Sequence, residues 1–216
     1  QHSFPTRRSS DLMIYRSKAP LRIGLAGGGT DVSPYSDQYG GAILNTTISL
    51  SAYATIELMD EDKIIVEALD RNEEQQFGLL SQLPIDGKLD LLKAVYNRIQ
   101  KDHPMPLHGF RLSTFVDAPA GSGLGTSSTL VVAVLGAFVE MLKLPFDEYK
   151  TAQYAYDIER NDLQLAGGKQ DQYAATFGGV NFMEFYGAGK VIVNPLRIKP
   201  EYLHELENNL VLYFTS

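Results

Sequence analysis

The segment from Thr126 to Leu142 constrains the fold more than any other, because apolar residues lie on nearly every side of the helix it predicts. A surface helix keeps a polar face, whereas a helix that is apolar nearly all round has to be buried. The apolar positions are Val131, Val132, Val134, Leu135, Phe138 and Val139. The 216 residues are enough for one sizeable domain, and this helix is predicted to lie at its centre.

Composition excludes several classes of protein. The chain has 19 Lys and Arg against 26 Asp and Glu, and its net charge of −7 argues against nucleic acid as the main partner. No cysteine is present, which excludes disulfides and thiolate metal sites and fits a cytoplasmic location. No apolar run reaches the roughly 18 residues of a membrane helix, so no membrane partner is expected. The oligomeric state stays open.

Hydrophobic periodicity predicts runs of strands with helices between them, which indicates an α+β fold. Helices are expected over 89–101, 126–142 and 146–160, and a short helix or turn over 31–39. Strands are expected over 15–26, 63–70, 109–117, 178–185, 190–195 and 208–216, with two more strands over 42–60. Asp86-Gly87 and 187–189 are predicted turns.

A glycine-rich loop, "APAGSGLGTSST", precedes the central helix. Glycines let backbone N–H groups approach a ligand closely, and a helix N-terminus favours anions. Together with the hydroxyl groups of Thr126, Ser127 and Ser128, this pattern predicts a phosphate site. A glycine turn that only caps the helix is the alternative. A P-loop would need a Lys that is absent, and the glycine spacing differs from a dinucleotide fingerprint.

Three separate segments resemble the motifs of the GHMP kinases, the superfamily that includes galactokinase and mevalonate kinase. "PAGSGLGTSS" resembles the second motif, "APLRIGLAGGGTD" the first, and "GGKQDQYAATFGG" the segment that carries the catalytic aspartate. The resemblance implies a GHMP kinase N-terminal domain of the ribosomal protein S5 domain 2-like type. Its sheet should be mostly antiparallel and packed by helices.

The domain organisation expected from this resemblance has three parts. Residues 1–12, "QHSFPTRRSSDL", lack apolar periodicity and are interpreted as a non-native lead-in before Met13. Residues 13–200 should form the N-terminal ATP-binding domain. Residues 201–216 should be the truncated start of a C-terminal ferredoxin-like domain, because no third glycine motif follows Gly189.

The resemblance implies an ATP-dependent, Mg²⁺-requiring kinase that phosphorylates a sugar. The wording of the first and third segments is most similar to a branch that acts on a heptose 7-phosphate at the anomeric hydroxyl, giving the 1,7-bisphosphate. Galactokinase is disfavoured because Gly28-Gly29 stands where that enzyme has Glu-His. The alternatives are another sugar kinase such as fucokinase, a non-catalytic nucleotide- or sugar-binding paralogue, and a dinucleotide-dependent oxidoreductase.

Asp171 and Arg22 are the catalytic candidates. The resemblance places Asp171 at the base that faces the acceptor hydroxyl. It places Arg22 at a basic position that either holds Asp171 ionised or stabilises the transferred phosphoryl group. Taken without the resemblance, both residues could be purely structural, since an Asp in a first helical turn is favourable anyway and an isolated strand Arg is commonly a surface residue.

Glu159 is predicted to lie on an apolar helix face shared with Ala152, Ala155 and Tyr156. A carboxylate there is costly unless it is paired or bound to a metal, and Arg16, Arg22 or Lys169 could pair with it. The resemblance makes Glu159 and Ser127 the ligands of Mg²⁺, which needs few protein oxygens.

The remaining site residues follow from the resemblance. ATP phosphates are expected at Gly121, Ser122, Gly123, Gly125, Thr126, Ser127 and Ser128. The sugar phosphate is expected at Asp31, Lys18 and Lys169, the two lysines being candidates for its distal phosphate. Asp31 is alternatively a turn residue after three glycines.

Overall fold

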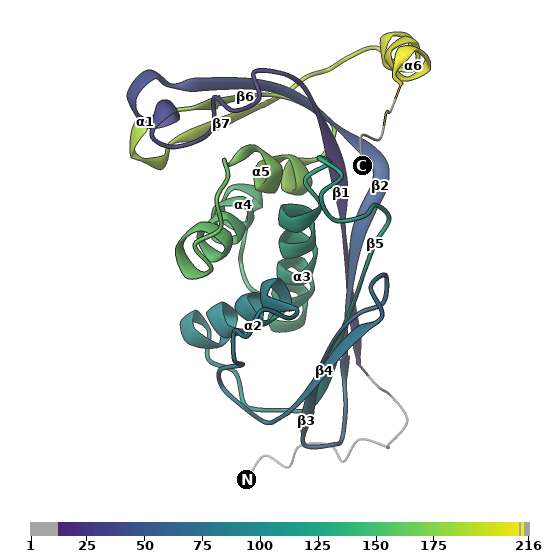
Figure 1. Cartoon of the computed structure of the whole chain (residues 1–216), viewed down its shortest axis with the longest axis vertical. Coiled ribbons are helices and arrows are strands. Elements are labelled where there is room, and N and C mark those ends of the chain that lie inside the picture. The colour runs from purple at the N-terminus through teal and green to yellow at the C-terminus, as the bar shows by residue number, and fades with distance from the viewer. Residues whose placement is uncertain (1–12, 212, 214–216) are drawn as a thin grey trace.

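A seven-stranded sheet carries the fold, and helices α2 to α5 pack against one of its faces (Figure 1). The structure is a computed structural model that describes residues 13–211 and 213, so the predicted lead-in 1–12 lies outside the described residues. The strands are β1 Ile14–Ala26, β2 Gly41–Leu58, β3 Lys63–Ala68, β4 Glu73–Gly78, β5 Phe110–Val116, β6 Val180–Phe185 and β7 Val191–Pro195. The helices are α1 Tyr35–Tyr39, α2 Asp90–Asp102, α3 Thr126–Leu142, α4 Glu148–Asp157, a π-helix Ile158–Asp162, α5 Gln170–Phe177, a 3₁₀ turn Gly187–Gly189 and α6 Pro200–Asn209.

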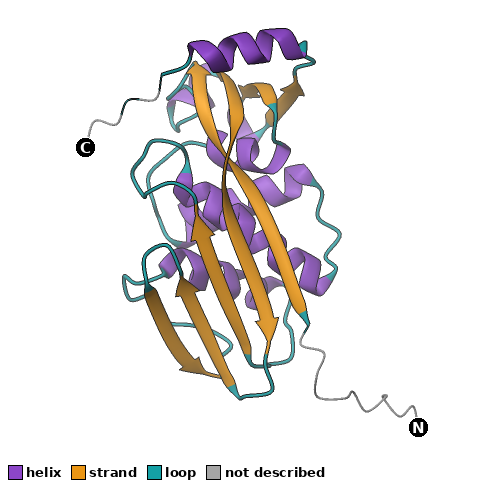
Figure 2. Cartoon of the chain, turned by 90° about the vertical axis from the view of Figure 1, so that its right-hand side faces the viewer, coloured by secondary structure: helices purple, strands orange, loops and turns teal. Residues whose placement is uncertain are grey.

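The sheet order is β4-β3-β5-β2-β6-β7, and β1 pairs with β2. Every pair is antiparallel except the parallel pair β3 and β5. The predicted α+β class and the mostly antiparallel sheet are therefore confirmed. Figure 2 shows the sheet face that helices α2 to α5 leave uncovered, with α6 crossing the ends of the long strands.

Strand β2 is the long central strand of this sheet. It pairs with β1 along one edge, and on its other edge first with β6 and then with β5. The expectation of two strands over 42–60 was wrong, because β2 continues from Gly41 to Leu58 without a turn. A single strand therefore joins the part of the sheet that contains β6 and β7 to the part that contains β5, β3 and β4.

A register shift in β1 between Pro20 and Arg22 turns the second half of the strand over. Before the shift, Ser17 faces helix α3, since its hydroxyl approaches Gly136. Side chains alternate between the two faces of a regular strand, so side chains an odd number of positions apart can share a face only across such an irregularity. After the shift, Arg22 and Gly24 face α5.

Helix α3 forms the centre of the core, as its sequence predicts. Its bounds agree with the expected 126–142, and residues from Ser128 to Leu135 are buried. It packs against β1, β2, α2, α4 and α5. The large apolar cluster around it includes Ile56, Leu112, Val131, Leu135 and Phe138, each fully buried.

The other differences from the sequence concern segment ends and elements that were not predicted. The helix expected over 146–160 ends at Asp157 and continues as the π-helix. Strand β4 and helix α6 were not predicted, since "EEQQFG" lacks apolar alternation. The strand expected over 208–216 begins inside α6, residues 210, 211 and 213 have no regular structure, and the rest lies outside the described residues.

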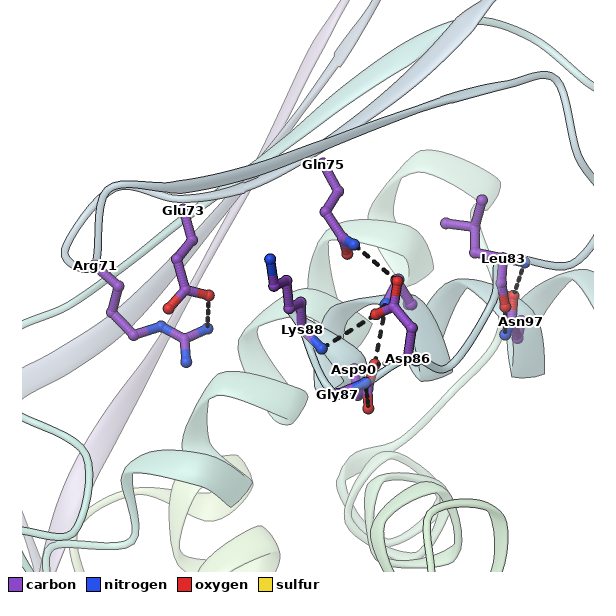
Figure 3. Close-up of polar contacts among 10 residues, drawn as sticks. Arg71, Glu73, Gln75, Leu83, Asp86, Gly87, Lys88, Asp90 and Asn97 are labelled. Carbon is purple, nitrogen blue, oxygen red and sulfur yellow. Dashed lines mark hydrogen bonds and ion pairs between the residues drawn. The ribbon is translucent and has the colours of Figure 1, made fainter.

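The loop before α2 is held by a polar network (Figure 3). The carboxylate of Asp90 accepts hydrogen bonds from the backbone N–H groups of Asp86 at 3.1 Å and Gly87 at 2.8 Å, and Asp86 accepts one from Gln75 of β4 at 2.9 Å. The fully buried ammonium of Lys93 pairs with Asp86 at 2.5 Å and Asp90 at 3.0 Å. This network confirms the turn predicted at Asp86-Gly87 and fastens the first turn of α2 to the sheet.

Within residues 13–211, no helix has both the length and the apolar character needed to cross a bilayer.

Candidate active site

An ion pair joins two of the predicted site residues from distant parts of the chain. The guanidinium Nε of Arg22 on β1 donates to Oδ1 of Asp171 in the first turn of α5, at 2.6 Å. The two side chains are 14% and 23% exposed, so the pair is sheltered but reachable. No hydrogen bond among the described residues reaches the other oxygen of Asp171, Oδ2, which leaves that atom able to accept from a ligand.

The glycine loop lies directly against this ion pair. Arg22 Nη1 donates to the carbonyl of Gly123 at 2.9 Å, and the Arg22 N–H donates to the carbonyl of Leu124 at 3.2 Å. Gly125 precedes α3 with a φ of 76°, and a Cβ there would lie 3.2 Å from Cγ of Asp171. Glycine is therefore needed at Gly125 both for its left-handed backbone and for the close approach of the carboxylate.

A second cluster joins α3, the π-helix and α5. Ser127 Oγ donates to Glu159 Oε1 at 3.0 Å, and Gln172 Nε2 donates to Glu159 Oε2 and, at 3.0 Å, to Ser128 Oγ. Glu159 is only 1% exposed, and Arg160 Nη1 lies 3.7 Å from its Oε1. A buried carboxylate beside an exposed hydroxyl forms a hard oxygen donor set, which fits a Mg²⁺ ion.

The π-helix gives Glu159 its position. Its far end is fastened to α2, because Arg98 Nη1 donates to both oxygens of Asp162, at 2.8 Å and 2.7 Å. Arg98 Nε also donates to Asp102 at 2.7 Å. Single turns of π-helix are frequent at functional sites, where they turn a side chain away from regular helical spacing.

A small pocket of about 140 Å³ opens beside the glycine loop. Gly121, Thr126 and Ser127 line one side of it, and Asp70, Arg71 and Leu91 line the other. Within the loop, the Ser122 hydroxyl is buried without a hydrogen-bond partner. Loop glycines and helix-start hydroxyls beside a pocket have the features of an anion-binding helix N-terminus.

A second pocket of about 420 Å³ lies on the other side of the ion pair. Its lining includes Arg22, Gly24, Gly28, Gly123 and Gln170. The Oε1 atom of Gln170 is buried without a partner. The glycine loop, the first-motif turn and the start of α5 all contribute to this pocket, and Arg22, the ion-pair partner of Asp171, lines it.

Asp31 is buried where the first-motif turn meets α5. Its Oδ2 accepts hydrogen bonds from the backbone N–H groups of Lys169 at 2.7 Å and Gln170 at 2.9 Å, while its Oδ1 has no partner. Gly168 allows this approach, since a Cβ there would lie 1.9 Å from Oδ2. Asp31 thus stabilises the start of α5 with one oxygen, while its other oxygen has no hydrogen-bond partner among the described residues.

The structure separates the two predicted lysines. Lys169 is 5% exposed and begins α5 beside Asp31. Lys18 is exposed, its ammonium lies 5.5 Å from the ring centre of Tyr53, and it stands on the sheet face opposite Ser17 and α3. The other predicted residues gather around Asp171 and the glycine loop, and Lys18 does not, because the β1 register shift turns over only the residues after it.

Three functional candidates were not identified from the sequence. Gln172 links Ser128 to Glu159, and Gln170 lines the pocket of about 420 Å³. Arg160 packs beside Gly168, to whose carbonyl its Nη2 donates at 3.3 Å. In the sequence, only the position of Gln170 and Gln172 on either side of Asp171 could have indicated that they belong to the site. Uncharged amides carry no charge pattern, however, so only packing reveals their contacts.

Known proteins share both this fold and these motifs. The family model of the GHMP kinases N-terminal domain matches residues 90–179, which include the glycine loop, Glu159 and Asp171. Residues 90–179 therefore match the GHMP kinases N-terminal domain, in agreement with the resemblance of the three motifs. Over 201 residues it is 54% identical to D-glycero-alpha-D-manno-heptose 7-phosphate kinase of Campylobacter jejuni, an alignment that covers 93% of this chain and 59% of that enzyme.

Two further proteins show how far the similarity extends. The crystal structure of a D-glycero-D-manno-heptose 1-phosphate kinase from Bacteroides thetaiotaomicron superposes with a TM-score of 0.87 and 57% identity, covering 90% of this chain and 63% of that one. L-fucokinase/L-fucose-1-P guanylyltransferase of Bacteroides fragilis is 28% identical over 96% of this chain and 24% of its own length. The chain thus spans about three fifths of the heptose kinases it matches.

Proposed function

We propose that this protein is an ATP-dependent kinase that transfers a phosphoryl group to a hydroxyl of a sugar phosphate. The observation that carries the proposal is the placement of Asp171, whose carboxylate lies against Gly125 of the glycine loop and is held there by Arg22. A phosphate held at the loop and a hydroxyl in the neighbouring pocket would meet at this carboxylate.

In this proposal the two oxygens of Asp171 have different tasks. Oδ1 is occupied by Arg22, which fixes the plane of the carboxylate. Oδ2 would accept a hydrogen bond from the acceptor hydroxyl and then its proton, as the hydroxyl oxygen bonds to the terminal phosphorus of ATP and the bond from that phosphorus to ADP breaks. Arg22 also places positive charge between the glycine loop and the pocket of about 420 Å³ that we propose for the acceptor. The phosphoryl group in transfer would carry its negative charge there.

The glycine loop supplies the nucleotide contacts. Backbone N–H groups of Gly121 to Gly125 and the hydroxyls at the start of α3 would bind the phosphates of ATP. Ser127 and Glu159 would hold Mg²⁺, which neutralises phosphate charge when bound. Gln172 keeps the Glu159 carboxylate directed toward Ser127, so the buried acid remains available on that side.

For the acceptor we propose a heptose 7-phosphate, phosphorylated at its anomeric hydroxyl. The support is the 54% identity to an enzyme named for that substrate. The solved relative is named a heptose 1-phosphate kinase, so the position that receives phosphate should be measured directly. Fucose remains the alternative acceptor, supported by a relative of 28% identity.

The test is an ADP-release assay with Mg-ATP on the protein as its gene encodes it, with heptose 7-phosphate, free heptose, fucose, galactose and mevalonate as acceptors. We expect heptose 7-phosphate to give the highest kcat/KM and phosphorus NMR to show a 1,7-bisphosphate product. Turnover confined to fucose or another free sugar would contradict the proposed acceptor. Absence of ADP release with every acceptor would contradict the kinase assignment.

A further inference from the structure

Lys169 is a nearly buried residue, and the described residues offer its ammonium no carboxylate partner within ion-pair distance. The residue is only 5% exposed, and its Nζ lies 5.5 Å from the centre of the Tyr156 ring. Burying a cation is costly unless it is paired. A contact with an aromatic ring replaces only part of the lost hydration, so this ammonium can still bind an anion.

A second cation lies against the same ring. Cζ of Arg160 is 5.9 Å from the centre of Tyr156, and its buried Nε has no hydrogen-bond partner. Glu159 Oε1 is 3.7 Å from Nη1, too far for a direct hydrogen bond. Two positive groups thus lie 5.5 Å and 5.9 Å from the centre of one ring, and an anion that contacts both would gain from both charges.

The position of this pair of cations suggests which anion it serves. Lys169 begins α5 only two residues before Asp171, and its backbone N–H donates to Asp31. Asp31 Oδ1 beside it is buried without a partner and can accept a hydrogen bond from a hydroxyl. The two cations can bind a phosphate, and the free Asp31 oxygen can accept a hydrogen bond from a hydroxyl. A ligand that carries both groups is a polyol phosphate.

We propose that Lys169 and Arg160, supported by Tyr156, bind the phosphate that the acceptor sugar already carries, and that Asp31 accepts a hydrogen bond from one of its hydroxyls. The inference rests on the proposed kinase function and adds to it the residues that select sugar phosphates over free sugars. Lys18, the other lysine candidate, has no such role, because it lies on the opposite face of the sheet with Tyr53.

The test compares kcat/KM for heptose 7-phosphate with kcat/KM for free heptose in the full-length protein. In Lys169→Met this ratio should fall by about 10- to 100-fold, the range expected for loss of a charge-assisted hydrogen bond to phosphate. Arg160→Gln should lower the ratio as well, and Lys169→Arg should restore most of it. KM for ATP serves as the check on folding.

The matched control is Lys150→Met, since Lys150 also lies over an aromatic ring, at 5.4 Å from Tyr154, but at the exposed start of α4. Its ratio should equal that of the wild type. An unchanged ratio in Lys169→Met, or a ratio that falls in Lys18→Met instead, would overturn the inference. These outcomes require an active wild-type enzyme, so a wild type without turnover would count against the kinase function separately.

Discussion

At the residue scale, Glu159 is a carboxylate on an apolar helix face whose hydrogen-bond partners become visible only in the structure. Its carboxylate is 1% exposed, yet it receives hydrogen bonds from Ser127 and Gln172 and has Arg160 nearby. Of the three partners that the sequence left open, none pairs with Glu159 in the described part of the chain. Amide and hydroxyl donors instead satisfy the buried carboxylate.

Glu159→Gln should weaken the response to Mg²⁺. The substitution keeps the size of the side chain and removes its charge, so the Mg²⁺ concentration for half-maximal activity should rise by about tenfold or more, or about 1.4 kcal/mol in binding. The measurement is ADP release at fixed ATP across a Mg²⁺ series. Glu140→Gln makes the same change on the exposed surface of α3 and should leave the Mg²⁺ response unaltered.

Sequence reasoning reached charged site residues more readily than uncharged ones. Asp171, Arg22, Asp31 and Glu159 stand in motifs or on an apolar face, so their chemistry could be anticipated. The role of Gln172 could not be anticipated, because the sequence does not indicate that its amide bridges Ser128 and Glu159. The choice between Lys18 and Lys169 depended on a single register shift in β1, which periodicity does not reveal.

At the scale of elements, the glycine loop and α5 work as one unit because Gly125 lets them touch. Gly125→Ala should place a methyl group against Asp171 and force a left-handed conformation on an alanine. We expect a loss of about 1 kcal/mol in the free energy of unfolding and a fall in kcat of at least about tenfold. Urea unfolding and steady-state kinetics measure the two effects.

The matched control for that substitution is Gly189→Ala. Gly189 has a φ of 74°, close to the 76° of Gly125, but a Cβ there would meet nothing within 4 Å. It should lose similar stability and keep wild-type kcat. Equal kinetic losses in the two variants would show that backbone strain, rather than the contact with Asp171, causes the effect.

Element prediction succeeded where one physical signal dominated and failed where packing decided. The central helix α3 was predicted at its observed bounds because only burial suits so apolar a segment. The π-helix could not be predicted, since it depends on the Arg98 and Asp162 pair formed across 64 residues. Strand β4 is polar and joins the sheet only through its pairing with β3.

At the scale of the whole molecule, the sheet and helices are held together partly by ion pairs that an acidic solution will remove. Asp86 is the clearest case, because its hydrogen bonds from Lys93, Gln75 and the Lys88 backbone lower its pKa from 3.8 to about 2. A carboxylate whose pKa is lower in the folded state stabilises the fold above its unfolded pKa. That contribution is lost as pH falls from about 3.8 toward 2.

The difference in stability between wild type and Asp86→Asn should therefore depend on pH. At pH 7 the wild type should be the more stable protein, and the difference should shrink as pH falls below 4. Urea unfolding of both proteins at pH 7, 5, 4 and 3 measures it. A difference that stays constant over this range would show that the Lys93 network does not couple proton binding to folding.

Whole-molecule topology was accessible from the sequence only through the resemblance. Periodicity indicated strands in runs with helices between them, and so the class, but not the order β4-β3-β5-β2-β6-β7 or the parallel pair within it. Strand order depends on contacts between distant segments, such as β2 with β6. The predicted boundary of a second domain near residue 201 stays a prediction.

The central claim is that Asp171, brought to the glycine loop by Arg22, acts on the acceptor hydroxyl. The most direct test is steady-state turnover of Asp171→Asn with Mg-ATP and heptose 7-phosphate, beside ATP affinity measured by calorimetry. We predict that kcat falls by about 10² to 10⁴, while the Kd for ATP stays within a few-fold of wild type. Turnover near the wild-type rate would contradict the claim.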